Sequence, residues 1–330
     1  MKMAEKKHSE LYILQILKEY TDEQHILTRK EIQGKLQDEY GIELDRRTFY
    51  AALDVLQKTG VEISVYEDNH KGYYLISREF EFSEMLLLCN AIHASGYIPR
   101  KASSDLVEKI LSTQSRYVIQ DYHDEIYLPN PKKTENKALL YNIEIISSAI
   151  HNKHNITFKY LSYNIHKKLV FRHDGKEYNM NPQFIAYQEG KPYLIAKDPI
   201  SQEYRHFILD RIASISEGRS KMPKIEKDDP YAYTSNRVFM YSGEKIEFTA
   251  RCSMKILDYI IDLFGMKVQI EKADNNHFIL HAVSTKQDII WLSQEYLDVM
   301  EILEPADIRN EITDNLKKCL ERYSENKSNS

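Results

Sequence analysis

Two arginines and a tyrosine stand close together in residues 191–215, KPYLIAKDPISQEYRHFILDRIASI. Alternating apolar residues around a turn predict a β-hairpin here. If its second strand is straight, Arg205 and Arg211 share one face with the apolar pair between them, Phe207 and Leu209. A guanidinium binds phosphate oxygens bidentately, and the ring of Tyr193 can stack on a base. The hairpin therefore predicts a site for a nucleotide or a nucleic acid.

Ion pairing is the alternative role for these arginines. Asp210 and Glu203 lie close to them in the sequence. Exposed ion pairs of this kind are common and contribute little to stability. The residues alone do not decide between the two roles.

Length and composition limit the class of protein. A chain of 330 residues can form two or three domains, each with its own core. It contains no run of about 18 apolar residues and no signal-peptide core near the N-terminus, so we expect a soluble, cytoplasmic protein. Cys89, Cys252 and Cys319 match no zinc or disulfide spacing and are expected to be ordinary buried thiols.

Charge is unevenly distributed along the chain, whose net charge is −5. Residues 1–78 hold 12 Lys/Arg and 14 Asp/Glu, a net charge of −2. Residues 152–220 hold 11 Lys/Arg and 7 Asp/Glu, a net charge of +4. The basic part of the chain is therefore the segment that contains the hairpin, which favours an anionic ligand there.

Residues 1–78 predict a winged helix-turn-helix. Apolar spacing indicates a helix over 9–20, and the capping box Thr28-x-x-Glu31 starts a second helix through Leu36. Asp45 can cap a third helix. Two short alternating segments, 61–66 and 73–76, then form the hairpin that would be the wing.

This arrangement predicts which side chains contact DNA. The first turns of the third helix enter the major groove in such folds, and here they carry Arg46, Arg47, Thr48 and Tyr50. Phosphate contacts are expected from the second helix and the wing, through Lys30, His70 and Lys71. The net charge of −2 over residues 1–78 argues against strong non-specific binding.

The remaining residues predict four further segments, which makes the chain a multidomain α+β protein. Residues 79–152 are helical in pattern and form either a connector with a dimer surface or plain inter-domain packing. Short strands over 153–217 predict a small antiparallel barrel, and residues 218–243 are interpreted as a linker. Residues 244–330 follow the order βαββαβ plus a terminal helix, which is typical of a ferredoxin-like domain.

Several of these motifs resemble those of the WYL-domain family of bacterial transcription regulators. The family's Trp-Tyr-Leu strand appears here as Pro192-Tyr193-Leu194, without the tryptophan. Its downstream pattern Arg-x-Phe-Arg-Leu-Asp-Arg-Ile appears over residues 205–212, with Ile208 in place of the second arginine. The usual Arg-Thr-x-Tyr of the DNA-binding helix appears as Arg47-Thr48-Phe49-Tyr50, whereas Ala51-Ala52 replaces the Arg-Asp that often follows, so position 51 is not expected to contact bases.

The resemblance covers nearly the whole chain and implies its architecture and ligands. It implies a winged helix-turn-helix, a helical connector, an Sm/SH3-like β-barrel named WYL and a C-terminal extension named WCX. It also implies homodimers whose binding to a double-stranded operator is regulated by an anionic effector, in some members single-stranded nucleic acid or a nucleotide. The residues expected to bind the effector are Tyr160, Ser162, Tyr193, Arg205, His206 and Arg211.

Other functions remain open at this stage. An enzyme or metal protein is one, but the pairs His151/His154 and His277/His281 are the only metal-like spacings and have no suitable partners in the sequence. The chain has no phosphate-binding glycine loop, nucleophile elbow or paired carboxylates, so no catalytic residue, metal or cofactor is expected. A metabolite-sensing regulator, a protein-docking platform and a nucleic-acid-binding accessory protein are further alternatives.

Overall fold

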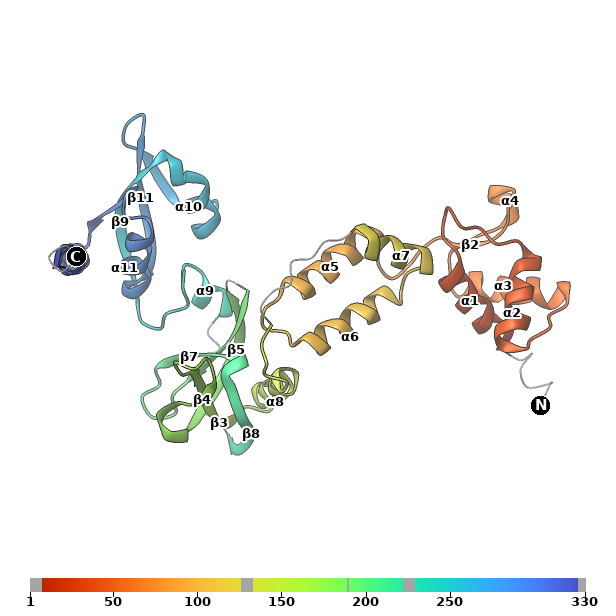
Figure 1. Cartoon of the computed structure of the whole chain (residues 1–330), viewed down its shortest axis with the longest axis horizontal. Helices are drawn as coiled ribbons and strands as arrows, with labels where there is room; N and C mark the ends of the chain where they lie inside the picture. The colour runs from red at the N-terminus through yellow and green to blue at the C-terminus, as the bar shows by residue number, and fades with distance from the viewer. Residues whose placement is uncertain (1–7, 126–132, 189, 222–228, 326–330) are drawn as a thin grey trace. The chain divides into compact units, whose positions relative to one another are not determined.

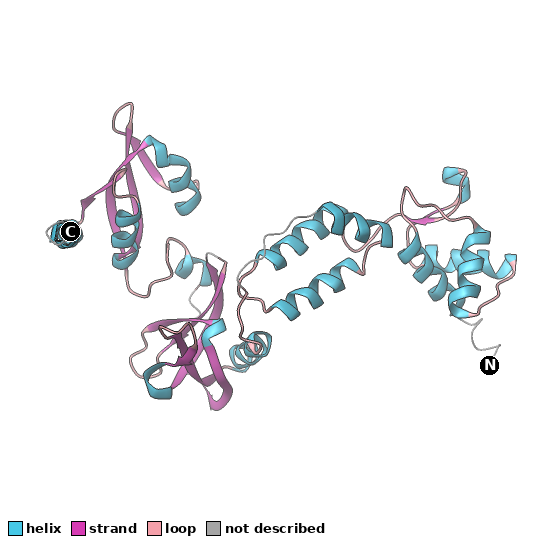
Figure 2. Ribbon diagram, viewed as in Figure 1, coloured by secondary structure: helices cyan, strands magenta, loops and turns pink. Residues whose placement is uncertain are grey.

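The computed structural model describes residues 8–125, 133–188, 190–221 and 229–325. The chain divides into two compact units, Met1–Glu135 and Asn136–Ser330 (Figure 1). Helices predominate in the first unit and strands in the second, so the chain is a multidomain α+β protein as predicted (Figure 2). Residues 126–132, which belong to the predicted connector over residues 79–152, lie outside the described residues. No described helix is both long and apolar enough to cross a membrane.

The first unit opens with three helices and two short strands in the predicted order. These elements are α1 (Ser9–Tyr20), α2 (Arg29–Tyr40), α3 (Arg46–Lys58), β1 (Ile63–Ser64), α4 (Tyr66–Asn69) and β2 (Tyr74–Leu75). The predicted capping box is confirmed, because Thr28 and Glu31 each accept a backbone N–H of the other. α2 continues past the predicted Leu36 to Tyr40 and ends at Gly41, whose φ of 67° is left-handed.

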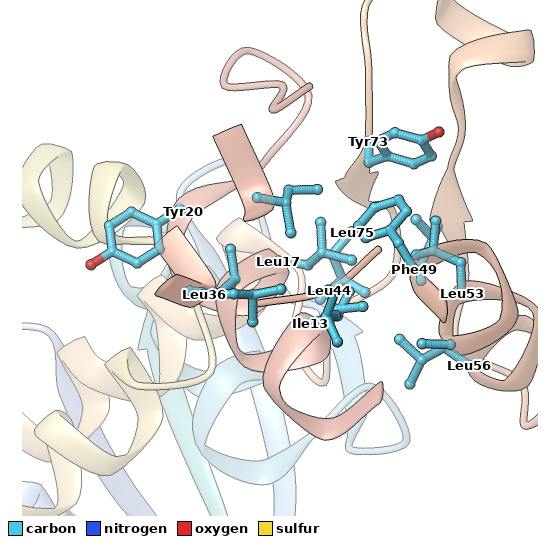
Figure 3. Packing of buried hydrophobic residues seen from close by; sticks show 14 of the residues in the cluster. Ile13, Leu17, Tyr20, Leu36, Leu44, Phe49, Leu53, Leu56, Tyr73 and Leu75 are labelled. Atoms are coloured by element: carbon cyan, nitrogen blue, oxygen red, sulfur yellow. The ribbon is translucent and has the colours of Figure 1, made fainter. Parts of the chain in front are cut away.

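One apolar core holds these elements together, and we call residues 8–78 the head. Ile13, Leu17, Leu36, Phe49 and Leu53 are at most 3% exposed and pack in one cluster (Figure 3). The strand side of the head is joined to the start of α2 by two hydrogen bonds between the backbones of Leu27 and Tyr73. Gly72 fits here because an added Cβ would lie 2.3 Å from the carbonyl oxygen of Leu27.

Three more helices complete the first unit: α5 (Phe82–Ala94), α6 (Arg100–Leu111) and α7 (Arg116–Glu125). Their core includes Met85 and Cys89, so the expectation of a buried thiol is confirmed for Cys89. Arg78 ties these helices to the head. Its Nη1 donates to the carbonyl oxygens of Lys18 and Thr113 at 2.9 and 3.1 Å, and its Nη2 donates to that of Thr21 at 2.5 Å.

The second unit begins with α8 (Leu139–Asn152) and a six-stranded antiparallel sheet. Its strands are β3 (His154–Tyr163), β4 (Leu169–Phe171), β5 (Glu177–Gln188), β6 (Lys191–Lys197), β7 (Tyr204–Ile208) and β8 (Ile212–Lys221). β3 pairs with β4, β5 and β8, and β6 lies between β5 and β7. Asn142 of α8 donates to the carbonyl oxygen of Ile212 at 2.9 Å, so this helix packs on the sheet.

The predicted linker over residues 218–243 differs from the structure. β8 extends to Lys221, and α9 (Pro230–Thr234) forms a further helical turn. Met240 is only 3% exposed and packs with Ile195 of the sheet. We call residues 229–241 the strap, because they are held on the sheet by side-chain contacts; residues 222–228 lie outside the described part of the chain.

The C-terminal elements follow the predicted order βαββαβ plus a helix. They are β9 (Lys245–Ser253), α10 (Leu257–Phe264), β10 (Gln269–Lys272), β11 (His277–Thr285), α11 (Lys286–Glu295), β12 (Met300–Glu304) and α12 (Ala306–Glu325). The sheet order is β10-β11-β9-β12, with all neighbours antiparallel. Cys252 lies buried in its core, as expected, whereas Cys319 is partly exposed on α12.

Candidate nucleic-acid and effector sites

The first turn of α3 presents two exposed arginines. The Asp45 carboxylate caps the helix by accepting the backbone N–H of Thr48 at 3.0 Å, which fixes where the helix begins. Arg46 and Arg47, directly after the cap, are both exposed. The hydroxyl of Thr48 donates to Asp45 at 2.8 Å, so this predicted DNA contact is already engaged in the cap.

Tyr50 lies one turn further along α3, among cations. It is 41% exposed, and its hydroxyl accepts a hydrogen bond from that of Tyr73 at 3.5 Å. The guanidinium carbon of Arg46 lies 5.7 Å from the ring centroid of Tyr50. The hydrogen bond from Tyr73, followed by the charges of Arg46 and Arg29, lowers the pKa of Tyr50. Arg29, which the sequence reasoning overlooked beside Lys30, therefore belongs to the same cationic surface.

The strand side of the head carries the other predicted phosphate contacts. His70 and Lys71 are exposed in the turn after α4, and Lys30 is exposed on α2. Asn69 shapes this turn, because its Oδ1 accepts the backbone N–H groups of Lys71 and Gly72 at 2.7 and 2.8 Å. The turn is therefore fixed by side-chain hydrogen bonds that hold two exposed basic residues in place.

The sheet does not bring the two hairpin arginines together. β7 ends at Ile208, and residues Leu209–Arg211 form a 3-10 turn, so the assumption of a straight strand was wrong. Phe207 and Leu209 are 6% and 0% exposed, which puts the apolar pair in the core. Arg205 lies near the start of β7 and pairs with Asp198 at 3.1 Å, a different acid from the two considered. Arg211 lies beyond the other end of the strand.

Tyr193 and His206 lie on the opposite face of the β6–β7 pair from Arg205. Ile195 is opposite His206 and Ala196 is opposite Arg205 in the register, and neighbouring residues alternate between faces. Tyr193 shares the face of Ile195 and belongs to the cluster under the strap. The ring nitrogens of His206 bond the Met240 carbonyl at 2.5 Å and the Tyr233 hydroxyl at 2.8 Å.

Burial sets the protonation state of His206. It lowers the pKa of the ring, against the raising effect of the Met240 carbonyl. A neutral ring that donates from Nδ1 to Met240 can accept from the Tyr233 hydroxyl at Nε2, so both contacts are satisfied. His206 therefore acts in this structure as the anchor of the strap.

Tyr160 and Arg211 do come together, at the end of the sheet where β7 turns. Tyr160 is 7% exposed, and its hydroxyl oxygen accepts the backbone N–H of Ile208 at 3.0 Å. Burial raises the pKa of Tyr160, whereas the positive charges of Arg211 and Arg172 act in the opposite direction. The guanidinium of Arg211 also lies 5.8 Å from the ring centroid of Tyr163. We call Tyr160, Tyr163, Arg172 and Arg211 the tyrosine–arginine end of the sheet.

Two members of this end were not foreseen. Arg172 precedes His173 and Asp174, which both have left-handed φ values, 50° and 53°, in the turn between β4 and β5. Tyr163 directly follows the predicted Ser162 and is 57% exposed. Ser162 pairs with Val170 of β4 and is partly exposed. Both could have been found as a basic and an aromatic residue within the predicted strands of residues 153–217.

The paired histidines have ordinary partners. His154 bonds Glu217 at 2.8 Å, His277 bonds Asp274 at 3.0 Å, and His281 lies 3.3 Å from the Thr249 hydroxyl. Among the described residues, no group of three His, Cys, Asp or Glu side chains is placed to hold a metal ion.

Among the comparisons with known proteins, the match to a family model lies over the sheet. The family model described as the WYL domain matches residues 141–217, which include most of α8 and nearly all of the six strands. The search of curated proteins finds no match.

Two solved structures are similar to this chain at low identity. One is proteasome accessory factor B/C (PafBC) of Arthrobacter aurescens, at 14% identity and a TM-score of 0.28, covering 95% of this chain and 48% of that one. The chain thus spans about half the length of PafBC. The other is described as a CRISPR Cas-related protein, at 13% identity and a TM-score of 0.38, covering 88% of this chain and 77% of that one. The family match confirms the resemblance for the segment that it covers: residues 141–217 form a WYL domain.

Proposed function

We propose that this protein is a DNA-binding transcription regulator. The exposed pair Arg46 and Arg47 on the first turn of α3 is the observation that carries the proposal. Three helices followed by two paired strands are the elements of a winged helix-turn-helix, in which this turn enters the major groove. Tyr50 would contact DNA beside them, and Lys30, His70 and Lys71 would contact phosphates.

The WYL domain would bind an anionic effector, a nucleic acid or a nucleotide, at the tyrosine–arginine end. Arg172 and Arg211 supply two charges there, and Tyr163 supplies an exposed ring on which a base can stack. Ser162 would add a hydroxyl from the same strand. The other expected effector residues have structural partners and would support the sheet and the strap. These residues are Tyr193, Arg205 and His206.

Regulation would work through a homodimer with two heads. α5 has an exposed apolar surface that includes Leu87 and Leu88, at 71% and 38% exposure, and this surface would join two copies. The C-terminal elements have the strand order of a ferredoxin-like domain and would be the WCX extension. An effector that binds one arrangement of the heads more tightly would change the affinity for the operator. The size of that change is limited by the difference between the effector's affinities for the two arrangements. No catalytic role is proposed.

The test is fluorescence anisotropy with a labelled duplex from upstream of the protein's own gene and a scrambled duplex, over a salt series. We expect tighter binding to the upstream duplex, with affinity that falls steeply as salt rises. The variant R46A/R47A should lose about 30-fold or more in affinity, since each of the two contacts contributes about 1–3 kcal/mol.

A variant with the same change of charge provides the control. Lys101 and Lys109 are exposed on α6, outside the head. The variant K101A/K109A should bind the operator as the wild type does. Equal weak binding of both duplexes by the wild type, or equal losses in the two variants, would contradict the proposal.

A further inference from the structure

A cavity of about 310 Å³ lies between β5 and the strap. Residues 184–188 of β5 form one wall, and residues 230–231 and 234–238 of the strap form most of the other. The strap begins after residue 217, where the WYL match ends, so this cavity is made in part by residues outside the matched domain. None of the tyrosine–arginine end lines it. The cavity is therefore a site apart from the tyrosine–arginine end, in the same unit.

Aromatic rings and neutral polar groups make up much of the lining. Tyr187 and Tyr231 are 57% and 78% exposed, so their rings offer stacking surface to a ligand. Gln188 and Thr234 already donate to the carbonyl oxygens of Val238 and Pro230, at 3.2 and 2.7 Å. Asn236 adds a further amide group to the lining. None of the residues that line the cavity is acidic, although the chain as a whole has a net charge of −5. The lining therefore favours a planar ligand that is not a cation.

Arg237 provides a buried positive charge at the cavity. It is 5% exposed, and three of its N–H groups donate to the carbonyl oxygens of Tyr233, Tyr241 and Gly243 at 3.0, 2.7 and 2.9 Å. These acceptors are neutral, and a guanidinium has five N–H groups. The guanidinium carbon of Arg237 also lies 4.2 Å from the ring centroid of Tyr233, a cation–π contact that does not neutralise the charge. The hydrogen-bond partners of Arg237 among the described residues include no carboxylate, and burial lowers its pKa. A buried charge with neutral acceptors is stabilised by an anion brought next to it.

Asp288 is the acid that acts on Arg237 over a longer distance. Its own oxygens are engaged, because they accept from the backbone N–H of Phe239 at 3.0 Å and from the hydroxyls of Ser284 and Thr285 at 3.2 and 2.7 Å. Asp288 is thus fixed as a capping and bridging group. It does not replace a counter-ion at the cavity.

We propose that this cavity binds a small planar anion: an aromatic ring system that carries a phosphate or a carboxylate, such as a nucleoside monophosphate or an aromatic acid. The ring would stack on Tyr187 or Tyr231, and the anionic group would approach Arg237. A volume of about 310 Å³ is at the lower end of ligand pockets, about 300–1,000 Å³, and suits one such molecule. The site goes beyond the proposed function, since it lies apart from the tyrosine–arginine end and its occupation does not require DNA.

Isothermal titration calorimetry of the full chain with AMP, benzoate and adenosine tests the proposal. We expect AMP or benzoate to bind and adenosine, which lacks the anionic group, to bind at least about tenfold more weakly, a difference of about 1.4 kcal/mol. Binding of AMP alone would identify the nucleotide class, and binding of benzoate alone the aromatic acids. Absence of binding by both anions at millimolar concentration would overturn the proposal.

Two variants avoid the structural role of Arg237. N236D adds a negative charge to the lining with almost no change of shape, and aspartate tolerates the left-handed φ of 63° at this position. Y231A removes an exposed ring. Each should weaken binding of the anion at least about tenfold. Y323A is the matched control, because Tyr323 is also 78% exposed but lies on α12, and it should bind as the wild type does.

These results are independent of the operator experiment. Anion binding that survives N236D and Y231A unchanged would sink the cavity proposal, whatever the protein does with DNA. If the wild type binds the upstream and the scrambled duplex equally, the regulator proposal is contradicted, and the calorimetry result is unaffected. The two failures are therefore distinguishable.

Discussion

The arginines of the head and those of the WYL sheet are held in different ways. Arg46 and Arg47 project from the first turn of a helix, and among the described residues neither has a carboxylate within 4 Å. Arg205 of the sheet is paired with Asp198, and Arg211 lies in a turn against the ring of Tyr163. A basic residue without an ion pair gives up no carboxylate when it binds a phosphate, whereas a paired one must exchange its carboxylate.

The difference shows that arginines of one sequence motif need not be equally able to bind a ligand. Arg205 and Arg211 belong to one sequence motif, yet one is engaged at the start of β7 and the other stands beyond its end. In the head, adjacent positions of one helix turn remain adjacent at the surface. A motif on a helix start therefore predicts a surface more directly than a motif that crosses the end of a strand.

The largest expected effect tests whether the two regions are energetically separate. Phe49 in the head and Phe158 in the sheet are both 0% exposed. Each Phe→Ala change should cost about 3–5 kcal/mol, since it removes contacts and leaves a cavity. Differential scanning calorimetry should show that F49A lowers only the transition of the first unit and F158A only that of the second. A common shift of all transitions in both variants would contradict the separation.

The next effect separates the two arginines of the motif. R211A should weaken binding of a short labelled single-stranded DNA about tenfold or more, because a hydrogen bond to a charged group contributes about 1.5–3 kcal/mol. R205A should change the affinity less than about fivefold, because its side chain is engaged in an exposed pair with Asp198, and such pairs contribute about 0–1 kcal/mol. Anisotropy of the two purified variants measures both. A larger loss in R205A would return the effector site to the start of β7.

The smallest effect concerns the strap and its dependence on pH. Burial lowers the pKa of His206 from 6.5, so the ring stays neutral in the folded protein while the unfolded chain gains a proton below that pH. Protonation then favours the unfolded state, so this stability is present above pH 6.5 and is lost as the pH falls towards the lowered pKa. The melting temperature of the wild type should therefore fall more than that of H206Q between about pH 7.5 and about pH 5.5.

An exposed histidine gives the control for this titration. His151 at the end of α8 is exposed, and H151Q should follow the wild type over the same pH range. If H206Q and the wild type fall in parallel, His206 is not the group whose titration loosens the strap.

Local signals predicted the head well. Thr28 and Asp45 each cap a helix through atoms three residues away, so their effect is contained in the sequence around them. The strap could not be predicted in this way, because its conformation depends on contacts with His206 and Ile195, which are distant in the sequence. The break of β7 at Leu209 has the same origin, since the turn that buries this side chain packs against α8 and β3, which are distant in the sequence.

Arg78 has a mechanical consequence for the first unit. Its planar guanidinium is hydrogen-bonded to Lys18 and Thr21 of the head and to Thr113 after α6. The two parts can therefore move little relative to each other at this point. Asp22 adds a second fastening, since it accepts from the Ser115 hydroxyl at 2.7 Å. A rotation of α6 or α7 would therefore be passed to the end of α1, which shares one apolar core with α3, so the joint would act as a stiff coupling.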